Sequence, residues 1–281
     1  MAYDAKSELD RVKKHYAQDP LQKRFSALIT GETNAGKTYM LRTARMPVHI
    51  DSFDPGSSKS LRADDSWPSS DPRRITSLNT ETNPQGQIFV DTSYENEDPY
   101  NPTAYAAWKK NLEIRKQTKY FHMFGTYCID SLTMLSKAIM NERTRGGMPS
   151  FNIDYTPAKI EIENKMNEIL TLPCDFVLTG HLEAITKLKS IDKKGIKDEE
   201  TVYRLMIIGK AVMTVPLLFD ELYVIKGSGQ NPRREMLVDS LGTYIARSRF
   251  KACFETRGFI DPDFKSFFKK VGLEWEDKEY L

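Results

Sequence analysis

The chain has only three cysteines among its 281 residues, so they cannot all pair with one another. Cys128 and Cys174 lie inside apolar runs that are typical of strands, and we expect both to be buried, reduced thiols of a cytosolic protein. No group of cysteines and histidines has the spacing of zinc ligands. A disulfide framework and a zinc site are therefore not expected.

Long apolar stretches and a strong charge of one sign are also missing. The longest apolar stretches, such as 211–219, are far shorter than a membrane span, and the first residues lack the apolar region of a signal peptide. The net charge of +2 is too small to indicate nucleic-acid binding by the whole surface, which leaves local patches. With 40% hydrophobic and 28% charged residues, the composition is that of a soluble globular protein, and we expect a cytoplasmic location without a membrane partner.

The strongest motif is a phosphate-binding loop at residues 31–38. An apolar run typical of a buried strand leads into Gly31-x-x-x-x-Gly36-Lys37-Thr38, and residues able to begin a helix follow. The glycines let successive N–H groups turn toward a phosphate, and the helix adds its positive dipole end. Lys37 is expected to reach the β- and γ-phosphates of ATP, and the Thr38 hydroxyl to hold Mg²⁺. The residues expected to bind the nucleotide are Gly31, Glu32, Thr33, Asn34, Ala35, Gly36, Lys37, Thr38 and Tyr39.

Three further groups complete the predicted catalytic set with Lys37. Asp130 ends an apolar strand and is expected to hold Mg²⁺ through water or through Thr38. Asp54, after the second strand, is the candidate that activates water, with Asp51 next, although Asp54-Pro55-Gly56 also fits a simple turn. His181 ends another strand at the same edge, where it either senses the γ-phosphate or has a structural role.

Strands that alternate with helices predict an α/β fold with a mostly parallel central sheet and helices on both faces. The segment 183–204 is expected to form a projecting hairpin and 210–219 a helix. Strands at 221–225, 235–238 and 244–247 are expected to extend the sheet, with an antiparallel extension at the C-terminal side. We expect an N-terminal helical appendage at 1–20, the core at 21–255, and a C-terminal helix and tail at 256–281. Within the core, the expected irregular segments are 57–86, 143–157 and 183–202.

The order of four segments resembles a RecA-like core, and most closely the bacteriophage Sak-type single-strand annealing ATPases. These segments are the P-loop, 50–56, 129–132 and 178–181, and the later runs 209–223 and 244–249 also look like that branch. The resemblance covers about residues 25–250 and implies a RecA-like fold and an ATPase that acts on single-stranded DNA in phage recombination or replication. It further implies a homo-oligomer in the cytoplasm of a host cell, with a single-strand-binding protein as a further candidate partner.

The chain departs from that family at informative positions. Asp54 stands where the family has a glutamate, and His181 where it commonly has an amide, so the rate of hydrolysis is in question. The oligomerisation region and DNA-binding domain of full recombinases are not matched, which favours annealing or loading over strand exchange. Two other functions stay open: a DNA-packaging or helicase-associated NTPase or loader, and a nucleotide-binding scaffold with little turnover.

Two loops occupy the positions of the family's DNA-binding loops, 143–154 and 183–201. The candidate DNA contacts in them are Arg143, Arg145, Lys187, Lys189, Lys193 and Lys194. The lysine-rich hairpin also fits a solvated turn, because acidic residues dilute its charge. Phe151 and Tyr155 either stack on bases or pack the first loop against the core.

Two arginines near the C-terminal side of the predicted core are candidates to act at the nucleotide site of a neighbouring subunit. Arg247 and Arg249 are expected on one face of a strand at 244–250, from which they would complete the charge around the γ-phosphate of a neighbouring subunit. Surface ion pairs are the alternative.

Overall fold

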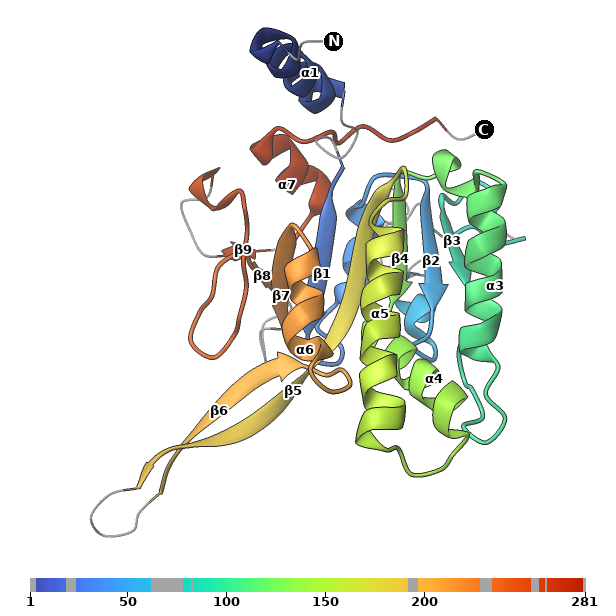
Figure 1. Cartoon of the computed structure of the whole chain (residues 1–281), viewed down its shortest axis with the longest axis vertical. Coiled ribbons are helices and arrows are strands. Elements are labelled where there is room, and N and C mark those ends of the chain that lie inside the picture. The colour runs from blue at the N-terminus through green and yellow to red at the C-terminus, as the bar shows by residue number, and fades with distance from the viewer. Residues whose placement is uncertain are drawn as a thin grey trace.

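The computed structural model contains a nine-stranded sheet covered by helices (Figure 1). The residues that it describes are 4–18, 24–61, 78–81, 83–191, 197–227, 234–253, 258–260 and 262–279. The strands are β1 (Ser26–Gly31), β2 (Val48–Ser52), β3 (Ile88–Asp91), β4 (Thr126–Asp130), β5 (Asp175–Ile191), β6 (Lys197–Leu205), β7 (Glu221–Gly227), β8 (Arg234–Leu237) and β9 (Gly258–Ile260).

Six neighbouring strands run parallel in the order β3-β2-β4-β5-β1-β7, and β8 and β9 continue the sheet antiparallel beyond β7. All residues of β1, β2 and β4 are buried, as expected for strands covered on both faces. The predicted fold class, a mostly parallel sheet with an antiparallel extension, is confirmed. Since β1 and β4 are separated only by β5, their carboxyl ends lie close together at one edge.

The helices are α1 (Ala5–Gln18), α2 (Lys37–Met40), α3 (Ala104–Gln117), α4 (Leu132–Thr144), α5 (Thr156–Ile169), α6 (Ala211–Thr214) and α7 (Phe264–Val271). No residue of α1 is buried, and the other helices cover the two faces of the sheet. The first core layer packs α3, α4 and α5 on one face, where Trp108, Leu112 and Ile162 are buried at helical spacing. On the other face, α2 and α7 pack Met40, Phe267 and neighbouring side chains against the sheet.

The long strand β5 joins the sheet to a projecting hairpin. Its first residues pair in parallel with β1 and β4, and from Leu182 onward it pairs antiparallel with β6 (Figure 1). The predicted hairpin is therefore present, and its first arm is a direct continuation of the strand that carries His181.

Three local expectations were wrong. The expected helix 210–219 is two short pieces, α6 and a 3-10 turn at Val215–Leu218. The segment 244–250 is irregular apart from two isolated bridges, which pair Arg247 with Leu222 and Tyr244 with Leu241. Strand β9 lies in the part expected to hold only a helix and a tail. The conformation of each of these segments depends on contacts with distant parts of the chain, and a local sequence pattern does not reveal such contacts.

Candidate active site

The P-loop connects β1 to α2 at the carboxyl edge of the sheet. Gly31 lies opposite His181 of β5 and Ile225 of β7, and a Cβ atom at Gly31 would stand 2.5 Å from the Ile225 carbonyl oxygen. Gly36 has a φ of 97°, in the left-handed region that favours glycine. Helix α2 is only one turn long, and a 3-10 turn at Leu41–Thr43 follows it. The expected helix dipole is therefore small, and phosphate binding would depend mainly on the loop amides and Lys37.

Lys37 is almost fully buried, with 5% of its surface exposed. Its Nζ donates to the carbonyl oxygens of Gly31 (3.1 Å) and Glu32 (2.8 Å), and lies 3.5 Å from His181 Nδ1. Burial lowers the pKa of the Lys37 ammonium, while the carboxylates of Asp130 and Asp54 oppose this change. The lysine thus lies between the loop and the two carboxylates that the sequence predicted for this site.

Asp130 ends β4 in full burial beside the P-loop. Its Oδ2 accepts a hydrogen bond from Thr38 Oγ1 (2.7 Å), and its Oδ1 accepts one from Thr179 Oγ1. Burial raises the pKa of Asp130; the bonds from Thr179 and Thr38 oppose this, and nearby Asp54 adds to it. The oxygen donors of Thr38 and Asp130 are of the kind that Mg²⁺ prefers, and a cation beside them would offset the cost of the buried charge.

Asp54 and His181 form a second pair at the same edge. His181 Nε2 lies 2.7 Å from Asp54 Oδ2, and Ser131 Oγ donates to Asp54 Oδ1 (3.0 Å). Nε2 of the ring thus faces Asp54, while Nδ1 faces the Lys37 ammonium. The histidine therefore bridges the P-loop lysine and the carboxylate proposed to activate water.

Glu95 is a functional candidate that sequence patterns did not reveal. It follows β3, and its carboxylate accepts hydrogen bonds from Ser52 Oγ (2.6 Å) and from the Gly56 amide (2.9 Å). Both bonds hold the turn that carries Asp54. No motif marks this residue, because only the pairing of β2 with β3 brings it to the turn.

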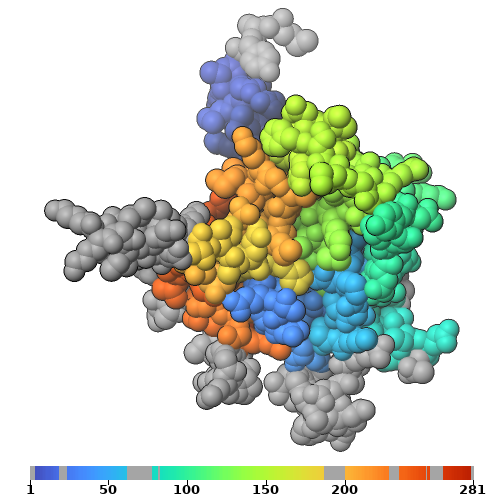
Figure 2. All heavy atoms as spheres, turned by 90° about the horizontal axis from the view of Figure 1, so that it is seen from below, coloured from blue at the N-terminus to red at the C-terminus, as the bar shows by residue number. Residues whose placement is uncertain are grey.

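Lys37, Thr38, Asp54 and His181 line a cavity of about 570 Å³. Figure 2 views this edge from below and shows the blue P-loop segment beside the light-blue segment that follows β2. Arg234 of β8 also lines the cavity, although no sequence motif predicted it there. The complete lining is Thr33, Asn34, Gly36, Lys37, Thr38, Tyr39, Asp54, Pro55, Gly56, Ser57, Lys59, Ser60, His181 and Arg234.

Asp51, the second candidate for activating water, lies in the core and does not line this cavity. It is fully buried, and its carboxylate accepts hydrogen bonds from Trp108 Nε1 (3.0 Å), Tyr127 OH (2.6 Å) and Arg115 Nη1 (2.7 Å). Its Oδ1 also lies 3.0 Å from His49 Nε2. Asp51 is therefore a core residue that ties α3 to the sheet, and the expectation that it activates water was wrong.

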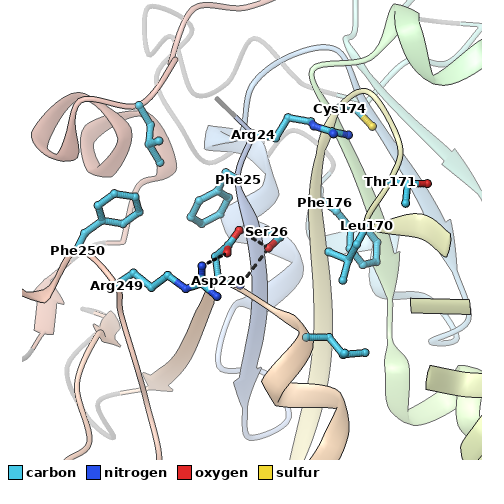
Figure 3. Close-up of a pocket in the computed structure, with 12 residues that line it drawn as sticks. Arg24, Phe25, Ser26, Leu170, Thr171, Cys174, Phe176, Asp220, Arg249 and Phe250 are labelled. Atoms are coloured by element: carbon cyan, nitrogen blue, oxygen red, sulfur yellow. Dashed lines mark hydrogen bonds and ion pairs between the residues drawn. The ribbon is translucent and has the colours of Figure 1, made fainter. Parts of the chain in front are cut away.

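Arg247 and Arg249 lie away from the chain's own P-loop. Arg247 Nη2 donates to the carbonyl oxygens of Pro216 (3.1 Å) and Phe219 (2.8 Å). Arg249 pairs with Asp220 (2.9 Å) beside a larger cavity of about 710 Å³, where β1, β5 and β7 begin (Figure 3). Because this cavity is at the opposite edge from Lys37 and Asp130, its size does not make it the nucleotide site.

The candidate DNA-binding residues are only partly described. Arg143 and Arg145 end α4, and Arg145 is exposed at the helix C-cap. Lys187 and Lys189 belong to the hairpin arm of β5, whereas Lys193 and Lys194 lie outside the described residues. In the first loop, Phe151 is 69% exposed, so it does not pack against the core.

Comparisons with known proteins give distant likenesses only. No protein-family model and no curated protein matches the sequence. Among solved structures, the chain is similar to the flagellar accessory protein FlaH from Methanocaldococcus jannaschii, with 13% identity, 84% of each chain covered and a TM-score of 0.41. It is also similar to the RadB recombinase, with 11% identity, 84% of each chain covered and a TM-score of 0.39. Because these sequence identities are so low, the description of the fold depends on the strand order, and that of the candidate site depends on the contacts given above.

Two kinds of feature are absent from the described part of the chain. No described helix is both long and apolar enough to cross a bilayer. No cluster of three or more histidines, cysteines, aspartates or glutamates suited to a metal ion occurs among the described residues. The expected Mg²⁺ site differs from such a cluster, since one protein hydroxyl and one carboxylate suffice when phosphate oxygens complete the ligands.

Proposed function

We propose that the chain is a RecA-like ATPase that binds ATP with Mg²⁺ and hydrolyses it. The observation that carries the proposal is the convergence of Lys37, the Thr38–Asp130 pair and the Asp54–His181 pair on one cavity. These groups lie at the carboxyl ends of β4 and β5 and in the segments that follow β1 and β2, at the edge where ligands sit in open parallel sheets.

Each group has a role that follows from its contacts. On ATP binding, Lys37 would exchange its bonds to the loop carbonyls for the β- and γ-phosphates. Thr38 and Asp130 would hold Mg²⁺, which supplies positive charge to the phosphates. Asp54 would accept a proton from the attacking water, and His181 would orient Asp54 and respond to the γ-phosphate.

The same edge supports the proposed link to single-stranded DNA. Strand β5 runs without interruption from the sheet, through His181, into the lysine-bearing hairpin. We propose that the hairpin and the loop 143–157 contact single-stranded DNA in a homo-oligomer during phage recombination or replication, by annealing or loading. Arg247 and Arg249 would act at the nucleotide site of a neighbouring subunit. A single-strand-binding protein is a further candidate partner.

One observation favours a second candidate, a nucleotide-binding scaffold with little turnover. Both carboxylate oxygens of Asp54 already accept hydrogen bonds, from Ser131 and His181. A carboxylate so engaged has less capacity to accept a proton from water.

ATP binding and hydrolysis, measured with and without single-stranded DNA, test the proposal. The wild type should bind ATP and hydrolyse it faster with DNA, while Lys37→Ala should lose binding or turnover. Binding without hydrolysis would favour the scaffold, and unchanged binding and hydrolysis in Lys37→Ala would refute the assigned site.

A further inference from the structure

Arg234 is the one cavity-lining residue, among those described, that comes from the antiparallel extension of the sheet. Its guanidinium lies directly over the P-loop: a Cβ atom at Gly36 would stand 2.6 Å from Arg234 Cζ and 2.7 Å from its Nη1. A side chain at position 36 would therefore displace the arginine as well as strain the backbone. The absence of that side chain lets a second cation approach the phosphate loop.

Arg234 also contacts Tyr39, the residue that follows the Mg²⁺-binding Thr38. The Arg234 Cζ lies 4.9 Å from the centre of the Tyr39 ring, within the range of a cation–π interaction. Arg42 Cζ lies 5.0 Å from the same ring, but Arg42 does not line the cavity. Tyr39 thus contacts two guanidinium groups, one inside the cavity and one outside it.

Arg234 lies in a different part of the cavity from the residues proposed to act at the γ-phosphate. Asp54 and His181 mark the end of the cavity where hydrolysis would occur. Arg234 packs instead on Gly36 and Tyr39, with no hydrogen bond to Asp54 or His181 among the contacts of the described residues. A nucleotide whose γ-phosphate faces Asp54 has its α-phosphate and nucleoside directed away from that end, toward Tyr39 and Arg234.

We propose that Arg234 binds the nucleotide in cis, at the α-phosphate and nucleoside end. The planar guanidinium is suited to both parts of this ligand, since its edge donates to phosphate oxygens and its face stacks on an aromatic base. Tyr39 would stabilise the guanidinium through the cation–π contact. The inference rests on the proposed nucleotide site and adds a specific binding residue to it.

Titration calorimetry with MgATP and MgADP tests this role in four proteins: wild type, Arg234→Ala, Arg234→Lys and Arg42→Ala. Arg234→Ala should bind ATP and ADP each about tenfold more weakly, since both ligands carry the α-phosphate and the base. Arg234→Lys should recover part of this loss through its charge but not through stacking. Arg42→Ala, which removes the same charge and a similar ring contact outside the cavity, should bind as the wild type does.

The outcomes separate this inference from the proposed function. Wild type that binds neither nucleotide would refute the proposed function itself. Wild-type affinity in Arg234→Ala, or a loss confined to ATP, would refute the role of Arg234 while leaving the site intact. An equal loss in Arg42→Ala would show that both arginines only support Tyr39, and melting temperatures of the nucleotide-free variants would detect a loss caused by unfolding.

Discussion

Asp54 is the single residue whose replacement should separate nucleotide binding from hydrolysis. The Asp54 side chain faces the cavity and is held by His181 and Ser131. An asparagine can keep both contacts, because its amide oxygen accepts a hydrogen bond from one partner and its amide group donates one to the hydroxyl of Ser131. Asp54→Asn should therefore keep ATP affinity while slowing single-turnover hydrolysis by about 10²- to 10⁴-fold, because an amide does not accept a proton from water. Glu95→Gln is the control for the turn itself, and hydrolysis at the wild-type rate in Asp54→Asn would exclude this carboxylate as the base.

A second prediction at this scale concerns pH and Asp175. This buried carboxylate accepts hydrogen bonds from the Phe25 amide (2.9 Å) and Arg45 Nη1 (3.2 Å), and burial raises its pKa to about 6. Because the pKa in the folded state exceeds the unfolded value of about 3.9, the folded protein binds this proton more tightly. The stabilising contribution is complete below the unfolded pKa and is lost as the pH rises through about 6.

Chemical denaturation at several pH values checks this sign. The stability of the wild type relative to Asp175→Asn should fall by about 1 to 3 kcal/mol between pH values of about 4 and 7.5. Asp91 provides the contrast, since burial raises its pKa but hydrogen bonds from Ser93, Tyr94 and Arg115 outweigh burial and lower it to about 2. The stability of the wild type relative to Asp91→Asn should stay nearly constant above a pH of about 5. A pH-independent difference for Asp175→Asn would contradict the raised pKa.

At the scale of elements, α1 and α7 should make very different contributions to stability. No residue of α1 is buried, and its apolar side chains Leu9, Val12 and Tyr16 are about half exposed or more. Deletion of residues 1–18 should therefore change the free energy of unfolding by no more than about 0.5 kcal/mol. Phe268→Ala in α7 removes a buried ring that packs against Phe25 and should cost about 3 to 5 kcal/mol. Thermal and chemical unfolding measure both, and a large loss on deleting α1 would mean that it packs on another surface.

Elements with a strong periodic pattern could be predicted from the sequence, and elements set by distant partners could not. The apolar faces of α3 and α5 and the continuous apolar strands β1 and β4 follow directly from the positions of their apolar residues. The short helix α2 and the strand β9 carry no such pattern. Their conformations depend on tertiary contacts, which a single sequence does not encode in any local window.

The residues of the candidate site also divide into those that could be predicted from the sequence and those that could not. Lys37, Thr38 and Asp130 could be predicted, because their chemistry requires a fixed loop and a strand that ends in a carboxylate. Glu95 and Arg234 could not, since they reach the site only through the pairing of β3 with β2 and of β8 with β7. Asp51 was misassigned because an aspartate on a strand near a P-loop looks the same whether it faces the cavity or α3.

At the scale of the whole molecule, the proposed DNA binding has to depend on local charge, because the chain is nearly neutral. The net charge of +2 gives little general attraction to DNA, so under the proposed function the lysine-bearing hairpin would supply phosphate contacts directly. Strand β5 leads from the nucleotide site into that hairpin, and the copies in an oligomer would add their contacts. DNA affinity should therefore be weak and strongly salt-sensitive for a monomer, and higher for the assembled form.

Replacing Lys189, Lys193 and Lys194 by Ala tests whether the hairpin makes these contacts. Each phosphate contact releases counterions, so losing contacts should lower single-stranded DNA affinity and also make its dependence on salt shallower. The control replaces Lys6, Lys13 and Lys14 of α1 by Ala, which changes the net charge by the same amount at a distant element. A shallower slope in the hairpin variant alone supports the DNA contact. Equal slopes in both variants would attribute the effect to net charge, and an unchanged slope in the hairpin variant would place the DNA elsewhere on the protein.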